Sequence, residues 1–169
     1  AKPTDSIVLS RETGDNRLSI TLAGNTKRTF HIPLINMDGS EQKIPKLTFS
    51  TRVEMPSDQL DEAVEDVGII AESVALMIKG GKFLINSENN LSEAKVEMPD
   101  SDSMSIVSKK EEDVSSKYSI DYLRKMVKGS KLADNVAIEF NNDYPLRLAY
   151  TVIDKVHLEF ILAPRVSND

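Results

Sequence analysis

The chain repeats one strand pattern near its two ends, and this repeat constrains its fold more than any other feature. Residues Lys2 to Leu9 match Lys131 to Ile138, 129 positions later, and both begin with Lys-x-x-Asp. Two further sets of alternating apolar residues match at an offset of 128: Leu18, Ile20 and Leu22 with Leu146, Leu148 and Tyr150, and Phe30, Ile32 and Leu34 with Leu158, Phe160 and Leu162. Apolar residues at every second position are typical of strands with one buried face. The repeat therefore predicts two related β-rich units.

The first unit is short. Its apolar alternation predicts a meander of three strands, at 6–10, 18–22 and 30–34. A meander of this size with one apolar face and no covering helix is not expected to be stable alone. It must pack on a missing half, on another copy or on the second unit. We therefore expect residues 1–36 to be the C-terminal half of a first domain, so that the chain starts within that domain.

Residues 48–169 carry the signals of a complete second domain. Apolar residues at helical spacing predict a helix over 57–67, with Ser57 as N-cap and Gly68 as stop, and a second helix over 119–128, ended by Gly129. Strands are predicted at 47–55, 73–79, 82–87, 91–98, 103–109, 113–118, 135–140, 145–152 and 156–163. Helices set among hairpins indicate an α+β fold with antiparallel sheets.

Residues 37–47 are predicted to connect the two units, within a longer stretch from Ile35 to Phe49 that interrupts the alternation. The first part of this stretch is polar and offers a sheet little to bury. Its far end becomes apolar again, at Ile44, Pro45, Leu47 and Phe49. A passive linker would not need those residues, so we expect this end to form one wall of a docking site.

Composition excludes several classes of protein. A formal charge of −6 argues against a surface that binds nucleic acid all over, and the absence of Cys excludes disulfides and thiolate metal sites. No apolar run is long enough for a membrane helix, which favours a cytosolic protein without membrane partners. His31 and His157 lie in alternating strands without a metal signature, and Gly80, Gly81 and Lys82 form a hairpin turn and no phosphate loop. We expect no enzymatic activity, no metal and no cofactor.

Four groups of residues, spread along the whole chain, resemble the DNA sliding clamp family, proliferating cell nuclear antigen, and its archaeal branch fits best. They are Lys27 to Phe30 leading into Pro33 and Leu34; Ile44 and Pro45; Asn142 to Leu146; and Leu158 to Arg165. The resemblance implies the DNA-clamp fold, with two helices per domain lining the DNA side. It also implies that the first part of the family's N-terminal domain is absent from this sequence.

The resemblance further implies a DNA polymerase processivity factor, a subunit of a ring of three that encircles duplex DNA. Its partners would be DNA polymerase, flap nuclease, ligase and the clamp loader, each bound through a peptide with a Gln plug, and other clamp subunits in a homotrimer or heterotrimer. The protein would be cytoplasmic in an archaeon and nuclear in a eukaryote. The alternative is a clamp-like protein interaction module that does not encircle DNA.

The basic face of the helix at 119–128 would then meet DNA. The residues expected to face DNA are Arg124, Lys125, Lys128, Lys131 and Lys2. Cations that meet phosphates attract DNA without reading its sequence, which suits a clamp that slides. Without the family, the same residues are more simply a solvated helix face. Glu62 and Glu65 on the other helix depart from the expected basic lining, because they would repel phosphate.

The resemblance also implies a subunit contact by strand addition and a groove for partner peptides. The contact would use the strands that carry Phe30 and Ile32 and, in the second domain, Val96 and Met98. The alternative is that these strands pair only within one chain. The groove would be lined by Ile44, Pro45, Phe49, Pro145, Ile161, Ala163, Pro164 and Arg165. Apolar residues that cover a core are the simpler explanation of some of these positions.

Overall fold

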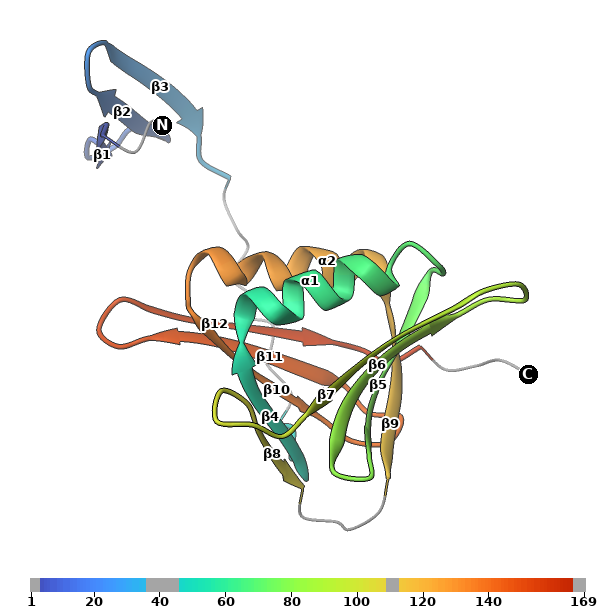
Figure 1. The fold of residues 1–169 in the computed structure, drawn as a ribbon. Coiled ribbons are helices and arrows are strands. Elements are labelled where there is room, and N and C mark those ends of the chain that lie inside the picture. Colours follow the sequence, from blue (N-terminus) through green and yellow to red (C-terminus); the bar gives the residue numbers. More distant parts are fainter. Residues whose placement is uncertain (1–3, 36–45, 109–112, 166–169) are drawn as a thin grey trace. The chain divides into compact units, whose positions relative to one another are not determined.

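The computed structural model describes residues 4–35, 46–108 and 113–165, which form two compact units, Ala1–Pro45 and Lys46–Asp169 (Figure 1). Lys2, Ile44 and Pro45, and nearly all of the predicted connector 37–47, lie outside the described residues. No helix in the described ranges is long and apolar enough to cross a membrane.

The first unit is an antiparallel sheet with the strand order β1-β2-β3. Its strands are β1 (Ser6–Ser10), β2 (Arg17–Ala23) and β3 (Lys27–Pro33), as the alternation predicts. Strand pairing places the large apolar side chains on one face: Ile7, Leu9, Leu18, Ile20, Leu22, Phe30 and Ile32. Apart from Val8, the other face is mostly polar, with hydroxyls that meet across the strands, as at Thr21 and Thr29, 3.2 Å apart.

The second unit contains two antiparallel sheets. The first has the order β12-β11-β10-β4-β8, and the second has the order β7-β6-β5-β9. The strands are β4 (Thr51–Pro56), β5 (Ser73–Lys79), β6 (Lys82–Glu88), β7 (Glu93–Pro99), β8 (Ser105–Ser108), β9 (Val114–Ser119), β10 (Asn135–Phe140), β11 (Leu146–Val152) and β12 (Val156–Leu162). The helices are α1 (Ser57–Val67), α2 (Ile120–Met126) and the 3₁₀ helix η1 (Val127–Lys131).

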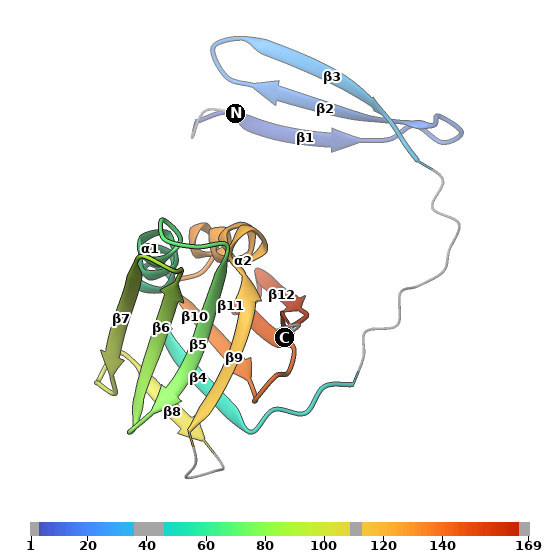
Figure 2. The ribbon, with the colours of Figure 1, turned by 90° about the vertical axis from the view of Figure 1, so that its right-hand side faces the viewer.

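One core joins the two sheets to the helices of this unit. Figures 1 and 2 show α1 and α2 side by side at one end of the sheets. The apolar stripes of both helices are buried, at Leu60, Ala63, Val64 and Val67 and at Ile120, Leu123, Met126 and Val127, as their spacing predicts. The side chains beneath them include Phe83 and Phe140, whose ring centroids are 6.2 Å apart. These contacts present the opposite faces of the helices to solvent.

Several predicted boundaries are wrong. The strand expected at 47–55 starts only at Thr51, since residues 46–50 are irregular. Ser57 is the first residue of α1 and caps nothing; its buried hydroxyl donates a hydrogen bond to the carbonyl of Ala133 instead. The helix predicted over 119–128 ends at Met126 and continues as η1, so Gly129 does not stop it. A Cβ at Gly129 would lie 2.5 Å from a Tyr150 ring carbon, so packing requires this glycine.

The repeat is visible in the strand pairing, but its predicted offset is wrong in the third strand. Leu22 pairs with Ile7 as Tyr150 pairs with Val136, which agrees with offsets of 129 and 128. Ile20 pairs with Phe30 as Leu148 pairs with Phe160, so Phe30 corresponds to Phe160 and not to Leu158. The β11-β12 hairpin has one further residue pair before its turn. A shift of two residues keeps every side chain on the same face, which is why the alternation conceals it.

Candidate partner-binding and DNA-facing surfaces

The hollow beside Phe49 is formed by the segment before β4 and the turn before β11. Thr48, Phe49, Ser50, Val114, Asn141, Asn142 and Tyr144 line this hollow of about 420 Å³. The Phe49 ring meets Tyr144 edge-on, with the centroids 5.8 Å apart, and the Arg147 guanidinium carbon lies 5.0 Å from the Phe49 centroid. An aromatic ring between an aromatic edge and a cation is held in a fixed orientation.

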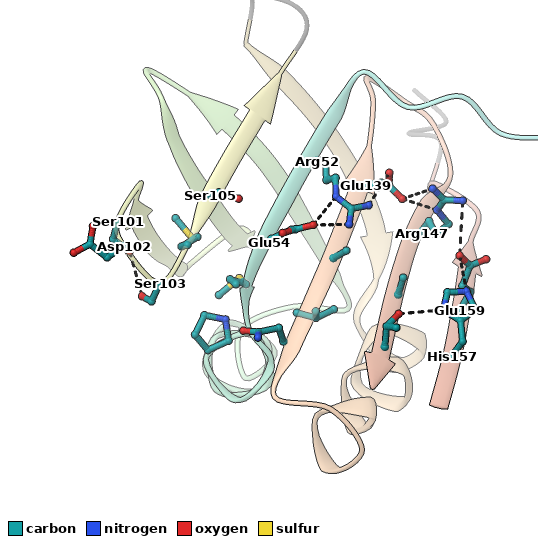
Figure 3. A pocket seen from close by; sticks show the side chains of 18 residues that line it. Arg52, Glu54, Ser101, Asp102, Ser103, Ser105, Glu139, Arg147, His157 and Glu159 are labelled. Carbon is teal, nitrogen blue, oxygen red and sulfur yellow. Dashed lines mark hydrogen bonds and ion pairs between the residues drawn. The ribbon is translucent and has the colours of Figure 1, made fainter. Parts of the chain in front are cut away.

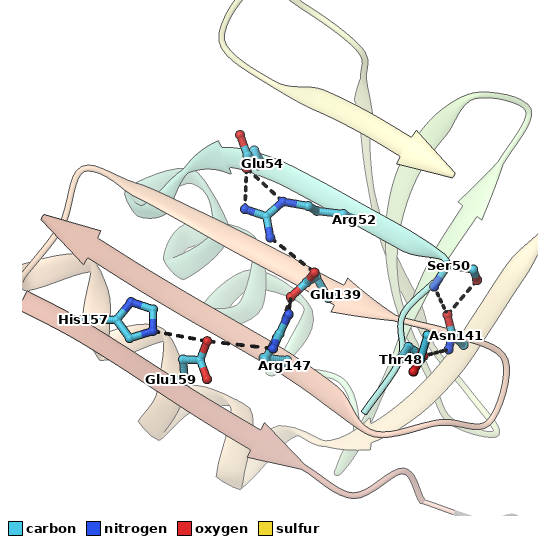
Figure 4. A network of polar contacts seen from close by, with 9 residues as sticks. All are labelled: Thr48, Ser50, Arg52, Glu54, Glu139, Asn141, Arg147, His157 and Glu159. Carbon is cyan, nitrogen blue, oxygen red and sulfur yellow. Dashed lines mark hydrogen bonds and ion pairs between the residues drawn. The ribbon is translucent and has the colours of Figure 1, made fainter. Parts of the chain in front are cut away.

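Asn141 fixes the backbone that carries Phe49 (Figure 4). Its Oδ1 accepts hydrogen bonds from the Ser50 amide and hydroxyl, both at 2.7 Å, and its Nδ2 donates to the Thr48 carbonyl at 2.9 Å. Sequence reasoning missed Asn141 and Arg147 as site residues. Only the polar turn between two predicted strands pointed to Asn141, and nothing in an alternating strand distinguishes Arg147 from an ordinary solvated residue.

The other predicted groove residues lie at the same end of the β11-β12 hairpin. Ile161 pairs with Arg147 and is 39% exposed. Pro145 precedes Leu146, which pairs with Leu162, and Ala163 and Pro164 follow Leu162. Phe49, Pro145, Ile161, Ala163 and Pro164 thus belong to one region, while the Ile44 and Pro45 wall lies outside the described residues.

Arg165 is held away from this hollow. Its amide donates to the Lys117 carbonyl at 2.7 Å, and its Nη1 donates to the Glu72 carbonyl at 3.2 Å. These bonds fix the chain after Pro164 along β9. We conclude that Arg165 positions the tail segment, and that its side chain does not line the Phe49 hollow.

A larger groove of about 650 Å³ lies on the outer face of the five-stranded sheet (Figure 3). Its polar centre is Glu139, which is 8% exposed. Arg52 Nη1 lies 3.3 Å from Glu139 Oε1, and Arg147 Nε donates to Glu139 Oε2 at 2.5 Å (Figure 4). Arg147 continues to Glu159 at 3.9 Å, and Glu159 lies 3.3 Å from His157 Nε2.

This network joins β4, β10, β11 and β12 and also reaches the hollow, because the Arg147 guanidinium lies over the Phe49 ring that lines it. Its carboxylates all have cationic neighbours. Among the described residues no cluster of His, Cys, Asp or Glu could hold a metal ion. The charged side chains of this groove are therefore paired with one another across four strands.

Apart from Lys2, which lies outside the described residues, the predicted DNA-facing residues lie on α2 and η1, next to the acidic surface of α1. Lys128 Nζ lies 3.0 Å from Glu65 Oε1 and 3.3 Å from Asp61 Oδ1, and these two hydrogen bonds, Glu65 first, raise the pKa of Lys128. Arg124 Nε lies 3.3 Å from Glu65 Oε2. Lys125 stacks on Tyr122, with Nζ 5.4 Å from the ring centroid. The side chains named are mostly exposed, but half of these cations already have carboxylate partners.

The predicted contact strands are both edges of their sheets. β3 is an edge of the first unit, where Phe30 and Ile32 are 50% and 47% exposed. β7 is an edge of the four-stranded sheet, but Val96 and Met98 are half-buried and pack on the core. The exposed side chains of β7 are Glu93, Lys95, Glu97 and, at its end, Pro99. A partner strand would therefore meet the backbone of β7 and not its apolar side chains.

The family model for the proliferating cell nuclear antigen C-terminal domain matches residues 43–165. The chain belongs to the proliferating cell nuclear antigen family. It is 36% identical over 167 residues to a DNA polymerase sliding clamp of Thermococcus sibiricus, covering 99% of this chain and 67% of that relative. A DNA polymerase sliding clamp of Pyrococcus furiosus is 32% identical over 167 residues, which again cover 99% of this chain and 67% of that relative.

The structure is similar to a crystal structure of proliferating cell nuclear antigen from Thermococcus kodakaraensis, with a TM-score of 0.84 and 30% identity, over 98% of this chain and 67% of that one. The predicted clamp fold, with antiparallel sheets and two helices in the second unit, is confirmed. The predicted function of a sliding clamp processivity factor is supported by these relatives and is likewise confirmed.

Proposed function

We propose that this chain acts as a clamp subunit that encircles duplex DNA and tethers replication and repair enzymes through the hollow beside Phe49. The observation that carries the tethering part is the meeting of Phe49, Tyr144, Arg147 and Ile161 at one end of the five-stranded sheet. Partners would be a DNA polymerase, a flap nuclease, a ligase and the clamp loader. The role requires no catalysis, and because the relatives are archaeal we place it in the cytoplasm.

The hollow suits an extended peptide with apolar anchors. Phe49 and Tyr144 give it aromatic surface, which packs well against a further aromatic side chain. Its remaining lining is Val114 and the polar residues Thr48, Ser50, Asn141 and Asn142. The exposed Ile161 adds apolar surface on the edge strand β12. Backbone groups of an edge strand can pair with an extended peptide, while pockets select its side chains. A peptide with a Gln plug and an aromatic anchor has both features.

Calorimetric titration with a Gln-plug peptide tests the groove. We expect Ile161→Ala together with Pro164→Ala to weaken binding at least tenfold, because truncating central anchors costs about 1–2 kcal/mol each. Ile153→Ala is a matched control, since Ile153 is 83% exposed in the turn at the other end of the hairpin. Equal affinities of the starting protein, the double variant and the Ile153→Ala control would exclude this groove. A peptide whose anchors are replaced by Ala should not bind to any of them. Ile44→Ala and Pro45→Ala test the wall outside the described residues.

We assign the DNA-facing role to α2 and η1, chiefly to Lys125 and Lys131, with Arg124 and Lys128 alongside and Lys2 outside the described residues. A clamp that encircles DNA is retained on closed circular duplex after loading and released when the circle is cut. Binding of the isolated chain to short linear duplex should be weak and salt-sensitive. Tight binding to short linear duplex would contradict encirclement.

We further propose the division into residues 1–36, a connector at 37–47 and a second domain at 48–169, with ring contacts between β3 and β7 of neighbouring subunits. The free edges of both strands support strand addition. Light scattering of a subunit with a complete first domain should show a trimer, which Phe30→Glu with Ile32→Glu should dissociate. A trimer that survives this change would exclude β3 as the contact.

One observation favours the alternative of an interaction module that does not encircle DNA. On the helix surface, carboxylates outnumber cations: Asp58, Asp61, Glu62, Glu65, Asp66 and Asp121 against Arg124, Lys125, Lys128 and Lys131. Such a surface attracts phosphate weakly. If peptide binding persists while loaded clamps are not retained on circular DNA, this alternative is correct.

A further inference from the structure

The cations of the helix surface differ in what holds them. Lys125 and Lys131 have no carboxylate partner within the part of the chain that the structure describes, whereas Lys128 lies between Asp61 and Glu65. Asp61 is itself oriented by Ser130, whose hydroxyl donates to Asp61 Oδ2 at 3.1 Å. The second carboxylate oxygen of Asp61 is thereby directed at Lys128. Lys128 is therefore held toward α1.

Arg124 is bound in a different way. It is 34% exposed, and a Cβ at Gly68 would lie 2.7 Å from its Nη2, so the guanidinium occupies the space that a side chain at Gly68 would need. Gly68 follows the last turn of α1, which has no basic residue of its own. A cation at a helix C-terminus complements the helix dipole. Arg124 therefore has a structural position at the end of α1.

Lys128 lacks such an anchor. Its side chain is 48% exposed, and that of Glu65 is 46% exposed. Ion pairs between exposed groups are weak, because water and salt screen them. A phosphate that comes close to η1 can therefore replace both carboxylates as the partner of Lys128.

We propose that Asp61 and Glu65 act as an electrostatic restraint, which competes with DNA phosphates for Lys128 and so weakens the grip of the helix surface on DNA. This inference rests on the proposed DNA-facing role of α2 and η1. Lys125 and Lys131 then provide the steady attraction, and Lys128 joins them only when phosphate displaces both carboxylates. The Arg124 side chain keeps its place against the C-terminal end of α1 whether or not phosphate is present.

The test is the salt dependence of binding to a short duplex of arbitrary sequence, measured by fluorescence anisotropy on the whole 169-residue chain. Asp61→Asn with Glu65→Gln keeps the side-chain shapes and removes the restraint. We expect the slope of log affinity against log salt to steepen by about 0.9, the value for one released cation on duplex DNA. Circular dichroism verifies that the variant is folded.

The matched control is Glu62→Gln with Asp66→Asn. It removes the same formal charge from α1, yet neither residue has an ion-pair partner in the described ranges. Its affinity should rise several-fold through reduced repulsion, with the slope nearly unchanged. Equal slopes for the two double variants would overturn the restraint, because charge alone would then explain the gain.

Two further variants separate the failure of this inference from that of the proposed function. Adding Lys128→Gln to the Asp61→Asn, Glu65→Gln protein should return the slope to its starting value; a gain that persists would point to Arg124 and contradict the restraint. Lys125→Gln with Lys131→Gln should reduce the slope of the unmodified chain. If it does not, the helix surface does not face DNA, and the proposed function fails independently.

Discussion

The β1-β2-β3 sheet and the β10-β11-β12 part of the five-stranded sheet are the same strand pattern in two surroundings. Equivalent pairs, such as Ile20 with Phe30 and Leu148 with Phe160, carry similar side chains. Leu148 is fully buried and its equivalent Ile20 only partly so, and Phe160 is partly buried where its equivalent Phe30 is 50% exposed. In the second unit α1, α2 and η1 belong to the core that covers this face; within the described residues of the first unit nothing does so. Alternation thus specifies which face is apolar but not whether it is buried.

The outer faces of the two sheets also differ. Ser10 and Ser19 occupy the positions of Glu139 and Arg147, so a charged network stands in the second unit where the first has hydroxyls and His31. The network extends to Arg52 on β4, a neighbour that the β1 edge lacks. The charged network thus occurs in the wider sheet, where Glu139 has partners on the strands at both of its sides.

The largest effect should come from truncating equivalent core residues. Leu148→Ala should cost about 2–5 kcal/mol, since it opens a cavity under the helices. Ile20→Ala should cost well under half of that, because Ile20 is only partly buried. Urea unfolding, followed by NMR signals assigned to each unit, measures both. Similar losses would mean that the first sheet is covered as fully as the second.

Gly129→Ala should come next, at about 1–3 kcal/mol. The added methyl group would meet the buried Tyr150 ring, which cannot move without disturbing the core. Lys131→Ala in the same 3₁₀ helix is the control, since Lys131 is exposed, and it should change stability by less than about 0.5 kcal/mol. A harmless Gly129→Ala would show that η1 lies further from the sheet than the structure has it.

Alkaline pH should destabilise the second unit selectively. Burial raises the pKa of Tyr118 to about 12 and that of Tyr150 further in the same direction. An unfolded tyrosine loses its proton near pH 10, so stability present below that pH is lost as the pH rises toward 12, by about 2 kcal/mol. All four tyrosines, at 118, 122, 144 and 150, lie in the second unit. Tyr118→Phe should reduce the pH dependence, and an equal alkaline loss in both units would refute this cause.

The smallest effect tests the outer faces. Glu139→Gln should cost about 1 kcal/mol, because Arg52 and Arg147 lose a charged partner but remain partly open to water. Ser10→Ala at the equivalent position should be nearly neutral. Thermal unfolding of both variants gives the difference. A Glu139→Gln protein as stable as the starting one would mean that the network contributes only orientation to Arg147.

The sequence predicted some residues of the candidate site and missed others. Phe49 was predicted because an apolar end on a polar connector is unusual, whereas Ile161 and Pro164 were predicted from the family resemblance. Asn141 and Arg147 were missed because their roles depend on partners from segments far apart in sequence. Val96 and Met98 were expected to serve a contact, but only the packing of β7 shows that they turn to the core.

The sequence alone determined the elements: α1 runs from Ser57 to Val67 as its apolar spacing requires, and Gly80 and Gly81 take positive φ angles in the hairpin turn. It also determined the face of each strand, since a period of two leaves no choice. Only the tertiary structure decided which face is covered, where β3 pairs in register, and that Lys128 meets Glu65 across two helices. These depend on contacts between distant segments, which short-range periodicity does not encode.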